Sequence, residues 1–273
     1  MPTAKIDDIN LYYEVEGEGE WAIFVHGGGG THLSWTPQVY ALRDRYKCLT
    51  YDARGSGQTE GVSDSPNGDR ELIALMDHLG IEKAFLNGWS AGGSAVSKVS
   101  QNHPDRVHAL IMTCCVFGFQ TAALNKWAAE MLDKFAKGIT IGDRVRPPDT
   151  AKDDPERHFL NGMLGRLNSR VRPRDASSYT NRFGDAYRLM RDTPPVDYSN
   201  FRVPSLFVVG EYDELQVPWL VRGTAEEIPG SMIVEIPDAG HGPPSEKPGT
   251  YNAVLMSFMD HHDPRTRSQQ NDN

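Results

Sequence analysis

The chain has 273 residues, with 28 Lys and Arg against 37 Asp and Glu, so its formal net charge is −9. A chain of this length can bury enough apolar surface to fold without a disulfide or a structural metal. The acidic balance, with no local cluster of basic residues, argues against nucleic acid as a partner, because phosphate binding needs a basic surface. Hydrophobic residues make up 38% of the chain, too many for a disordered protein.

Cysteine usage and targeting signals point to a soluble protein. Cys48, Cys114 and Cys115 lie in apolar runs and show neither a disulfide framework nor a metal-ligand spacing, so we expect buried thiols in strands. The first twenty residues are acidic and hold no apolar run, which argues against a secretory signal. No stretch of about 18 apolar residues is present. We therefore expect a cytoplasmic protein that does not bind membranes.

Short apolar runs rich in β-branched residues alternate with longer amphipathic segments, which predicts a mostly parallel sheet with helical crossovers. The first run mixes polar and apolar residues and indicates an antiparallel edge strand, whereas most of the others are continuous, as in strands buried on both faces. The expected strands are Leu11–Glu16, Trp21–His26, Tyr46–Tyr51, Lys83–Gly88, His108–Thr113, Ser205–Val209 and Met232–Ile236. The expected helices are Pro37–Arg45, Asp69–Leu79, Ala91–Asn102 and Gly249–His262.

This alternation stops after about residue 117, and residues 119–200 show one helical pattern after another. Strand character returns at Ser205. A helical block between two strands of one sheet is an insertion, so we expect a cap at 119–200 over the carboxyl edge of a core formed by 1–118 and 201–262. The polar, aperiodic tail 263–273 is expected to be disordered.

The most informative motif is Gly88-Trp89-Ser90-Ala91-Gly92, a G-x-S-x-G sequence between a predicted strand and a predicted helix. A turn this tight leaves little room for side chains, which explains a glycine on each side of the central tripeptide. Such a turn lifts the Ser90 hydroxyl clear of the backbone, at the positive end of the following helix. Ser90 is therefore the candidate nucleophile.

A serine nucleophile needs a base and an acid that orients the base, in the chain order Ser, Asp or Glu, His. Asp213 and His241 each follow a predicted strand, so both should lie at the carboxyl edge of the sheet near Ser90. Asp238 competes with Asp213 as the acid but is more typical of a turn. Histidine at position 26 ends a strand, which favours a structural hydrogen bond. The other histidines considered, on predicted helices or in the cap, are His78, His103, His158, His261 and His262.

A glycine-rich segment, His26-Gly-Gly-Gly-Gly30, follows the second predicted strand and indicates an oxyanion hole. Bare backbone lets N–H groups approach a developing negative charge closely, and the expected donors are the amides of Gly28 and Ala91. The alternative, a phosphate cradle, lacks the G-x-G-x-x-G spacing and a Walker lysine. Trp89 and Gly29 are candidate substrate contacts.

Taken together, these motifs resemble the α/β-hydrolase superfamily over residues 10–262. The matching segments are His26–Gly28, Asp52–Gly57, Gly88–Gly92, Gly210–Asp213 and Gly240-His241. The resemblance implies an α/β-hydrolase fold, with a mostly parallel twisted sheet, helices on both faces and a helical cap insertion. It also implies a triad of Ser90, Asp213 and His241, with Gly28 and Ala91 as oxyanion donors.

The expected reaction is hydrolysis of a small carboxylic ester or lactone through an acyl-enzyme, a mechanism that implies no metal and no organic cofactor. Two alternatives stay open. Some motifs also resemble the proline iminopeptidase branch, in which an acidic cap residue reads the free amine of the substrate; the candidates are Glu130, Asp153, Asp154 and Glu156. A ligand receptor of the same fold, with slow turnover, is the second alternative. A homodimer is also left open.

Two departures from the family pattern bear on the site. The segment from Gly57 to Ser90 is several residues shorter than expected for relatives, which predicts a more open pocket. Asn87 replaces the usual aliphatic residue, either bonded to neighbouring backbone or as a polar group under the nucleophile. The cap carries an apolar stripe that is either cap core or pocket lining: Trp127, Met131, Phe135, Phe159 and Met163.

Overall fold

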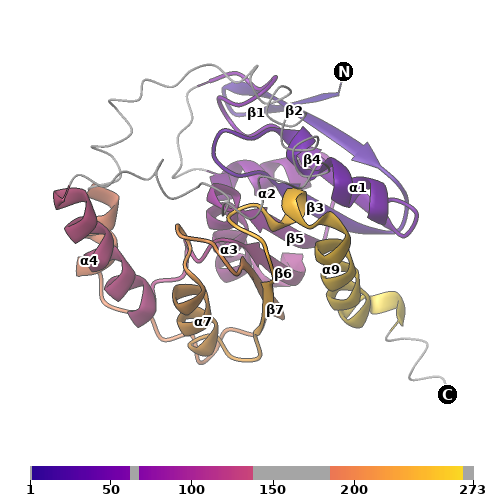
Figure 1. Cartoon of the computed structure of the whole chain (residues 1–273). Coiled ribbons are helices and arrows are strands. Elements are labelled where there is room, and N and C mark those ends of the chain that lie inside the picture. Colours follow the sequence, from indigo (N-terminus) through magenta and orange to yellow (C-terminus); the bar gives the residue numbers. More distant parts are fainter. Residues whose placement is uncertain (1, 62–67, 138–184, 267–273) are drawn as a thin grey trace.

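The computed structural model describes residues 2–61, 68–137 and 185–266 (Figure 1). In this part of the chain, eight strands form one sheet in the order β1-β2-β4-β3-β5-β6-β7-β8. The pairings of β1 with β2 and of β2 with β4 are antiparallel, and all the others are parallel. The strands are β1 (Thr3–Ile6), β2 (Ile9–Glu16), β3 (Glu20–Val25), β4 (Tyr46–Tyr51), β5 (Ala84–Trp89), β6 (Val107–Thr113), β7 (Ser205–Gly210) and β8 (Met232–Ile236).

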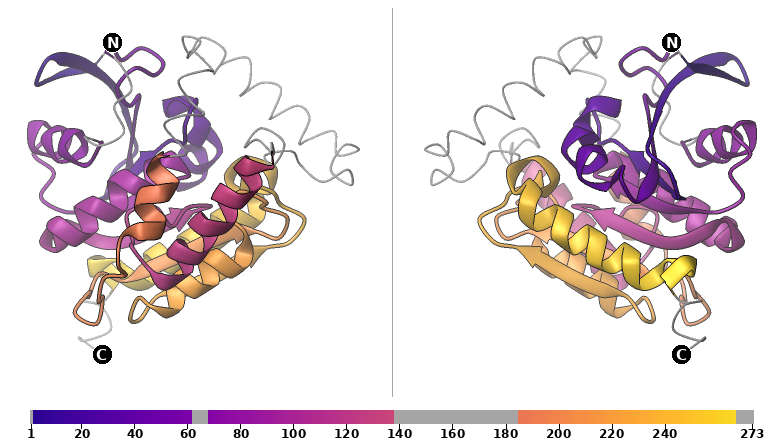
Figure 2. Two further views of the ribbon diagram at one scale, coloured as in Figure 1. Left: turned by 90° about the vertical axis from the view of Figure 1, so that its left-hand side faces the viewer. Right: turned by 90° about the vertical axis from the view of Figure 1, so that its right-hand side faces the viewer.

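Helices cover both faces of the sheet, as Figures 1 and 2 show. One face packs against α2 (Gly68–His78), α3 (Ala91–Asn102) and α7 (Pro218–Glu226), with α4 (Ala122–Ala136) lying against α7. The other face packs against η1 (His32–Trp35), α1 (Thr36–Leu42) and α9 (Pro248–His262), with α8 (Pro243–Glu246) lying against these three helices. A short helix, η3 (Pro104–Arg106), leads from α3 into β6.

The central strands are apolar on both faces because both faces are covered. Every residue of β7 is buried, and β5 is buried up to Gly88. Alternate residues enter different cores: Leu86 belongs to the cluster under α2 and α3, whereas Phe85 belongs to the cluster under α1 and α9. This continuous burial explains why these strands were recognisable as apolar runs.

The seven predicted strands are all present, but the expectation that Leu11–Glu16 is an edge strand is wrong. It forms part of β2, which is antiparallel as expected, and β1 pairs with its outer side. The four residues of β1 bury only Ala4 and Ile6, an alternation too short to stand out in an acidic segment. Helix α7 was also not predicted.

Strands β6 and β7 are parallel neighbours, although the whole segment between Thr113 and Ser205 separates them in the sequence. Much of the expected cap, including Phe159 and Met163, lies outside the described residues, as does the side chain of Phe135. Its described parts join the main core: Trp127 packs edge-on against Tyr187, with ring centroids 5.1 Å apart. Trp127 and Met131 are both buried in the cluster that includes the sheet, which favours packing over pocket lining.

The beginning of the polar tail differs from the expectation of disorder. Residues 264–266 form a helical turn, and Asp263 is buried, with its carboxylate bound by the Arg265 side chain. The half-exposed Arg265 guanidinium also donates to the carbonyl oxygen of Arg45 at 3.1 Å, which ties this end of the chain to the core, whereas the remaining tail residues, 267–273, lie outside the described part.

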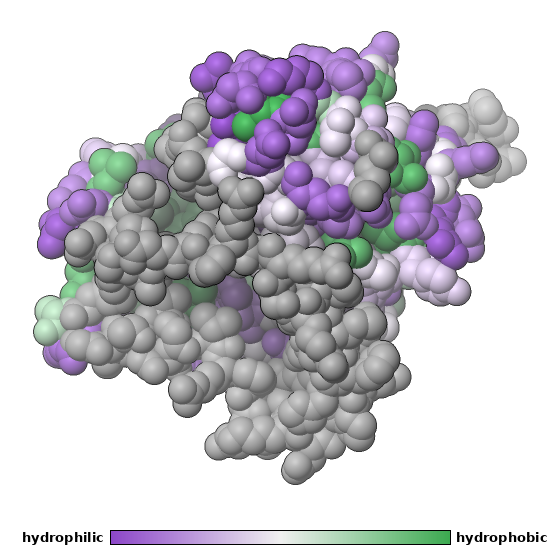
Figure 3. Space-filling model, turned by 90° about the horizontal axis from the view of Figure 1, so that it is seen from above, coloured by the Kyte–Doolittle hydropathy of each residue, from purple (hydrophilic) through white to green (hydrophobic). Residues whose placement is uncertain are grey.

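The described part of the chain holds no helix that is both long and apolar enough to cross a bilayer. On the face shown in Figure 3, the described residues are mostly hydrophilic, and hydrophobic residues form small separate groups. All three cysteines are free and buried, as expected, although Cys114 and Cys115 lie just beyond β6 and not within it.

Candidate active site

The turn between β5 and α3 places Ser90 in an unusual backbone conformation. Its φ of 51° and ψ of −119° lie in a region that side chains rarely adopt. The neighbouring glycines make this turn sterically feasible. A Cβ on Gly92 would lie 2.3 Å from the carbonyl oxygen of Val25, and one on Gly88 would lie 2.7 Å from the Cα of Gly93. The predicted elbow is therefore present, with Ser90 at its apex.

Ser90, His241 and Asp213 converge at the carboxyl edge of the sheet, as the positions of their strands predicted. The Oγ of Ser90 lies 2.9 Å from Nε2 of His241. On the other side of the ring, Nδ1 lies 2.9 Å from Oδ2 and 3.1 Å from Oδ1 of Asp213. Three side chains from distant parts of the chain thus form one continuous hydrogen-bonded relay.

The environment of Asp213 keeps its carboxylate ionised. Burial would raise the pKa of Asp213, but the charge and hydrogen bond of His241 and the backbone N–H of Gln216 outweigh it, so the pKa lies below its ordinary value. The N–H groups of Leu215 and Gln216 each donate to Oδ1 at 2.9 Å. An ionised acceptor at Nδ1 leaves Nε2 free to accept the hydroxyl proton of Ser90.

Hydrogen bonds anchor the backbone of the residues before and after His241. Glu246 accepts the N–H of Gly240 at 2.6 Å and that of Gly242 at 3.2 Å, so one carboxylate spans the histidine. The indole N–H of Trp89 donates to the carbonyl oxygen of His241 at 2.8 Å. Sequence reasoning missed Glu246, whose only signal is an acid five residues after the histidine. For Trp89, proposed from the sequence as a substrate contact, the structure adds an anchoring hydrogen bond.

The glycine segment after β3 lies close to the nucleophile. A Cβ on Gly27 would be only 3.2 Å from the Cβ of Ser90. Gly28, Gly29 and Ala91 are exposed, and within the described residues no hydrogen bond uses the N–H of Gly28 or Ala91. Both amides are therefore available to a ligand oxygen near Ser90.

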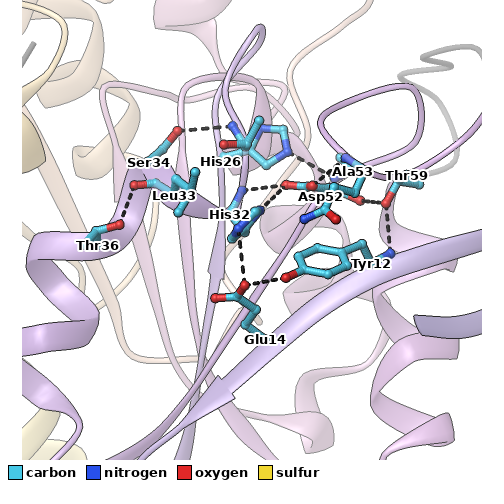
Figure 4. A network of polar contacts seen from close by, with 12 residues as sticks. Tyr12, Glu14, His26, His32, Leu33, Ser34, Thr36, Asp52, Ala53 and Thr59 are labelled. Atoms are coloured by element: carbon cyan, nitrogen blue, oxygen red, sulfur yellow. Dashed lines mark hydrogen bonds and ion pairs between the residues drawn. The ribbon is translucent and has the colours of Figure 1, made fainter. Parts of the chain in front are cut away.

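A buried polar network fixes this glycine segment at both ends (Figure 4). At one end, Nε2 of His26 accepts the N–H of Ala53 at 3.0 Å, the structural role expected for that histidine. At the other end, His32 donates to Oδ1 of Asp52 from its backbone N–H at 2.7 Å, and its Nδ1 lies 2.7 Å from the same oxygen. Glu14 approaches Nε2 of His32 at 3.5 Å. Hydrogen bonds to Asp52 and Ala53 thus hold both ends of the glycine segment in place.

The other candidates from the sequence that the structure describes have partners or positions outside the relay. Asp238 is exposed in a turn with a φ of 52°, with the Lys247 amine 3.9 Å from its carboxylate. Asn87 donates to the carbonyl oxygen of Ile23 at 3.2 Å, in line with the backbone-bonded alternative. His78 and His103 end helices, and His261 and His262 lie in α9. His158, Asp153, Asp154 and Glu156 lie outside the described residues.

A cavity of about 460 Å³ opens beside the acid of the relay. It lies between α4 and the segment that joins β7 to α7, and neither Ser90 nor Trp89 nor Gly29 lines it. The lining residues are Lys134, Glu211, Tyr212, Asp213, Glu214, Val217, Pro218 and Trp219. The cavity therefore borders the segment that carries Asp213, whose own side chain is buried.

Comparison with known proteins places this fold and site in a family. Residues 22–254 match the alpha/beta hydrolase family, and the chain belongs to it. The chain is 28% identical over 282 positions, 95% of its length and 98% of the relative's, to a putative carbamate hydrolase RutD of Caulobacter sp. (strain K31). It is 27% identical to a pimeloyl-[acyl-carrier protein] methyl ester esterase of Pectobacterium atrosepticum, over 91% of this chain and 98% of the relative.

Among solved structures, the enol-lactonase of Burkholderia xenovorans LB400 superposes with a TM-score of 0.67 at 23% identity, covering 94% of this chain and 99% of that one. At this identity the likeness shows the fold alone. The family and the names of the relatives together support a hydrolytic enzyme.

Proposed function

We propose that the protein is a serine hydrolase that cleaves a small carboxylic ester or lactone through an acyl-enzyme. The observation that carries this proposal is the relay from Ser90 through His241 to Asp213. A hydroxyl that donates to a neutral imidazole, with an ionised carboxylate behind it, is the arrangement that turns serine into a nucleophile.

In the proposed reaction, Nε2 of His241 takes the proton of Ser90 while Oγ attacks the carbonyl carbon of the substrate. The negative charge that develops on the carbonyl oxygen is held by the N–H groups of Gly28 and Ala91. The imidazolium then gives its proton to the leaving alcohol, and Asp213 stabilises the cation. A water molecule then attacks the acyl carbonyl carbon while Nε2 takes its proton. The same proton returns to Oγ of Ser90 as the carboxylic acid leaves. Apart from the substrate and this water, the chain's own residues supply every group that these steps use.

The choice of ester or lactone rests on the chemistry of the relay and on the relatives, one of which is a methyl ester esterase. Neither of the two relatives reported above is named as a peptidase. Of the four candidate amine-binding carboxylates, only Glu130 lies in the described part of the chain. We therefore keep the peptidase and the slow receptor as outcomes of the test.

The test is a panel of p-nitrophenyl esters of increasing acyl length and γ-lactones, assayed with the wild type, Ser90→Ala and the matched control Ser94→Ala, one helical turn further along α3. We expect sustained turnover in the wild type and control, and a kcat lower by about 10⁴-fold or more in Ser90→Ala. Cleavage of proline p-nitroanilide without ester cleavage would support the peptidase. A single slow turnover would support the receptor.

A further inference from the structure

Cys114 lies directly against the acid and base of the relay, although the proposed mechanism does not use it. Its Sγ, a carboxylate oxygen of Asp213 and a ring nitrogen of His241 all lie within 4.8 Å of one another. The thiol is buried, and its Sγ also approaches the carbonyl oxygen of Gly240 at 3.9 Å.

The backbone fixes Cys114 in this place. It follows the last residue of β6 with a φ of 48°, a strained value for a residue with a side chain. Its N–H donates to the carbonyl oxygen of Val208 in the neighbouring strand β7 at 2.7 Å. The hydrogen bond to β7 therefore fixes the Cys114 thiol close to the segment that carries Gly240 and His241.

Thiolate, imidazole and carboxylate are the ligand types that zinc and related thiophilic cations select. Ligand atoms around a tetrahedral Zn²⁺ stand about 3.3–3.8 Å apart, given metal–ligand distances of about 2.0–2.3 Å. A spacing within 4.8 Å needs only small side-chain movements to reach this geometry.

The cavity that borders Asp213 carries an excess of negative charge. Two exposed carboxylates, those of Glu211 and Glu214, line it with one lysine, Lys134, and Asp213 borders it with a buried side chain. A concave surface with an excess of negative groups raises the local concentration of cations. Ser90 does not line this cavity, so a cation gathered there lies on the Asp213 side of the relay.

We propose that Cys114, Asp213 and His241 form an inhibitory site for a thiophilic divalent cation, with Zn²⁺ as its representative. The inhibition, though not the binding, rests on the proposed function of Ser90 and His241.

Binding changes the protonation of two groups. Sγ of Cys114 forms a bond to the metal and releases its proton to solvent. Nδ1 of His241 gives up the proton that it shared with Asp213 and binds the metal through its lone pair. The imidazole stays neutral, because its other nitrogen, Nε2, takes up a proton in exchange. That N–H points at Oγ of Ser90 and cannot accept the hydroxyl proton. The histidine is thereby removed as a base, with one proton released per ion.

Cys115 provides a matched control within the same dipeptide. It is equally buried, but its Sγ accepts the N–H of Phe117 at 3.3 Å and lies against Gly93, in the cluster under α3. Both thiols can be replaced by serine, whose hydroxyl is a much poorer ligand for zinc but preserves size and hydrogen bonding.

The binding experiment uses chains that carry Ser90→Ala, so that no turnover is needed. After treatment with a chelator, Zn²⁺ is titrated by calorimetry in two buffers of different ionisation enthalpy. We expect one ion per chain and release of about one proton per ion, the stoichiometry of a single thiolate ligand. Adding Cys114→Ser should weaken binding by at least about tenfold, whereas adding Cys115→Ser should leave it unchanged.

The activity experiment measures p-nitrophenyl acetate hydrolysis against Zn²⁺ concentration, each variant relative to its own rate without metal. We expect inhibition that EDTA reverses, with a midpoint raised by at least about tenfold in Cys114→Ser and unchanged in Cys115→Ser. Equal binding and inhibition in both serine variants, or no binding in the Ser90→Ala protein, would overturn the metal site. Zinc binding to a chain without esterase activity would instead leave the site standing and refute the proposed function.

Discussion

The carbonyl oxygen of His241 accepts a hydrogen bond from the indole N–H of Trp89, the residue that precedes the nucleophile. Trp89 also packs edge-on against Trp35, with ring centroids 6.2 Å apart, so this packing holds its ring in addition to the hydrogen bond. The amides on either side of His241 bind Glu246. We infer that the backbone of the histidine is positioned by side chains that take no part in proton transfer.

The substitution Trp89→Phe tests this positioning because it keeps an aromatic ring and removes the donor. Loss of a hydrogen bond worth about 1 kcal/mol should lower kcat by roughly 3- to 10-fold, with a smaller change in KM. Steady-state kinetics with a short-chain ester measure both parameters. The matched control is Trp35→Phe, because the indole nitrogen of Trp35 has no hydrogen-bond partner among the described residues. A fall in kcat of equal size in both variants would refute the anchoring role.

At the scale of the elements, the contact between β3 and the start of α3 is as close as backbone packing permits. Gly92 faces the carbonyl oxygens of Val25 and His26, where a Cβ would lie at 2.3 and 2.6 Å. The strand and the helix therefore fix each other, and with them the positions of Ser90 and of the glycine segment after His26.

Gly92→Ala is expected to separate α3 from β3 and to destabilise the protein by about 1–3 kcal/mol. Urea denaturation followed by circular dichroism gives the free energy of unfolding. Gly249→Ala in α9 is the control, because nothing lies within 4 Å of a Cβ there and alanine favours a helix. A Gly92→Ala protein as stable as Gly249→Ala would mean that the elbow tolerates a wider spacing than the structure indicates.

The network that holds the glycine segment contains a pH-sensitive pair of residues. Burial alone would lower the pKa of His32, but the hydrogen bond and charge of Asp52, together with Glu14, raise it above 6.5. Burial would likewise raise the pKa of Asp52, but His32 and the N–H of Gln58 lower it below 3.8. The histidine's contribution to stability is therefore complete below pH 6.5 and is lost as the pH rises through its folded pKa. The contribution of Asp52 to stability is present above pH 3.8 and is lost as the pH falls through its lowered folded pKa.

In His32→Asn, the amide can still donate to Asp52 but carries no charge. We expect the variant to be less stable than the wild type by about 1–3 kcal/mol near pH 6 and the gap to narrow toward pH 9, as the pH rises through the raised pKa of His32. Denaturant midpoints at the two pH values measure the gap. A gap that is constant or wider at the higher pH would show that His32 is not charged in the folded protein.

For the molecule as a whole, the parallel sheet explains what the sequence could predict. The sequence places Asp213 and His241 beside Ser90 because the carboxyl ends of parallel strands share one edge. Asp213 follows β7, which is buried throughout, whereas His241 follows the edge strand β8, of which only Ile236 is buried. The short β1 escaped prediction because its burial depends on pairing with β2 and not on its own pattern.

The partners of the relay were less predictable, for a physical reason. The contacts of Trp89 with the His241 carbonyl, and of Cys114 with Asp213, join segments more than 90 residues apart in the sequence. No local periodicity encodes such contacts, since they arise only when the sheet has assembled. Glu246 is near His241 in sequence, but its role depends on the turn that α8 begins.

Every step of the proposed reaction depends on the activation of Ser90 as a nucleophile by His241 in the folded protein. The most direct measurement is covalent labelling with a fluorophosphonate, followed by intact-mass analysis and peptide mapping. We expect one adduct per chain, located on Ser90 in the native protein, and none in Ser90→Ala, in His241→Ala or in wild-type protein unfolded in urea. Labelling of another residue, or ester hydrolysis that continues undiminished in Ser90→Ala, would contradict the account.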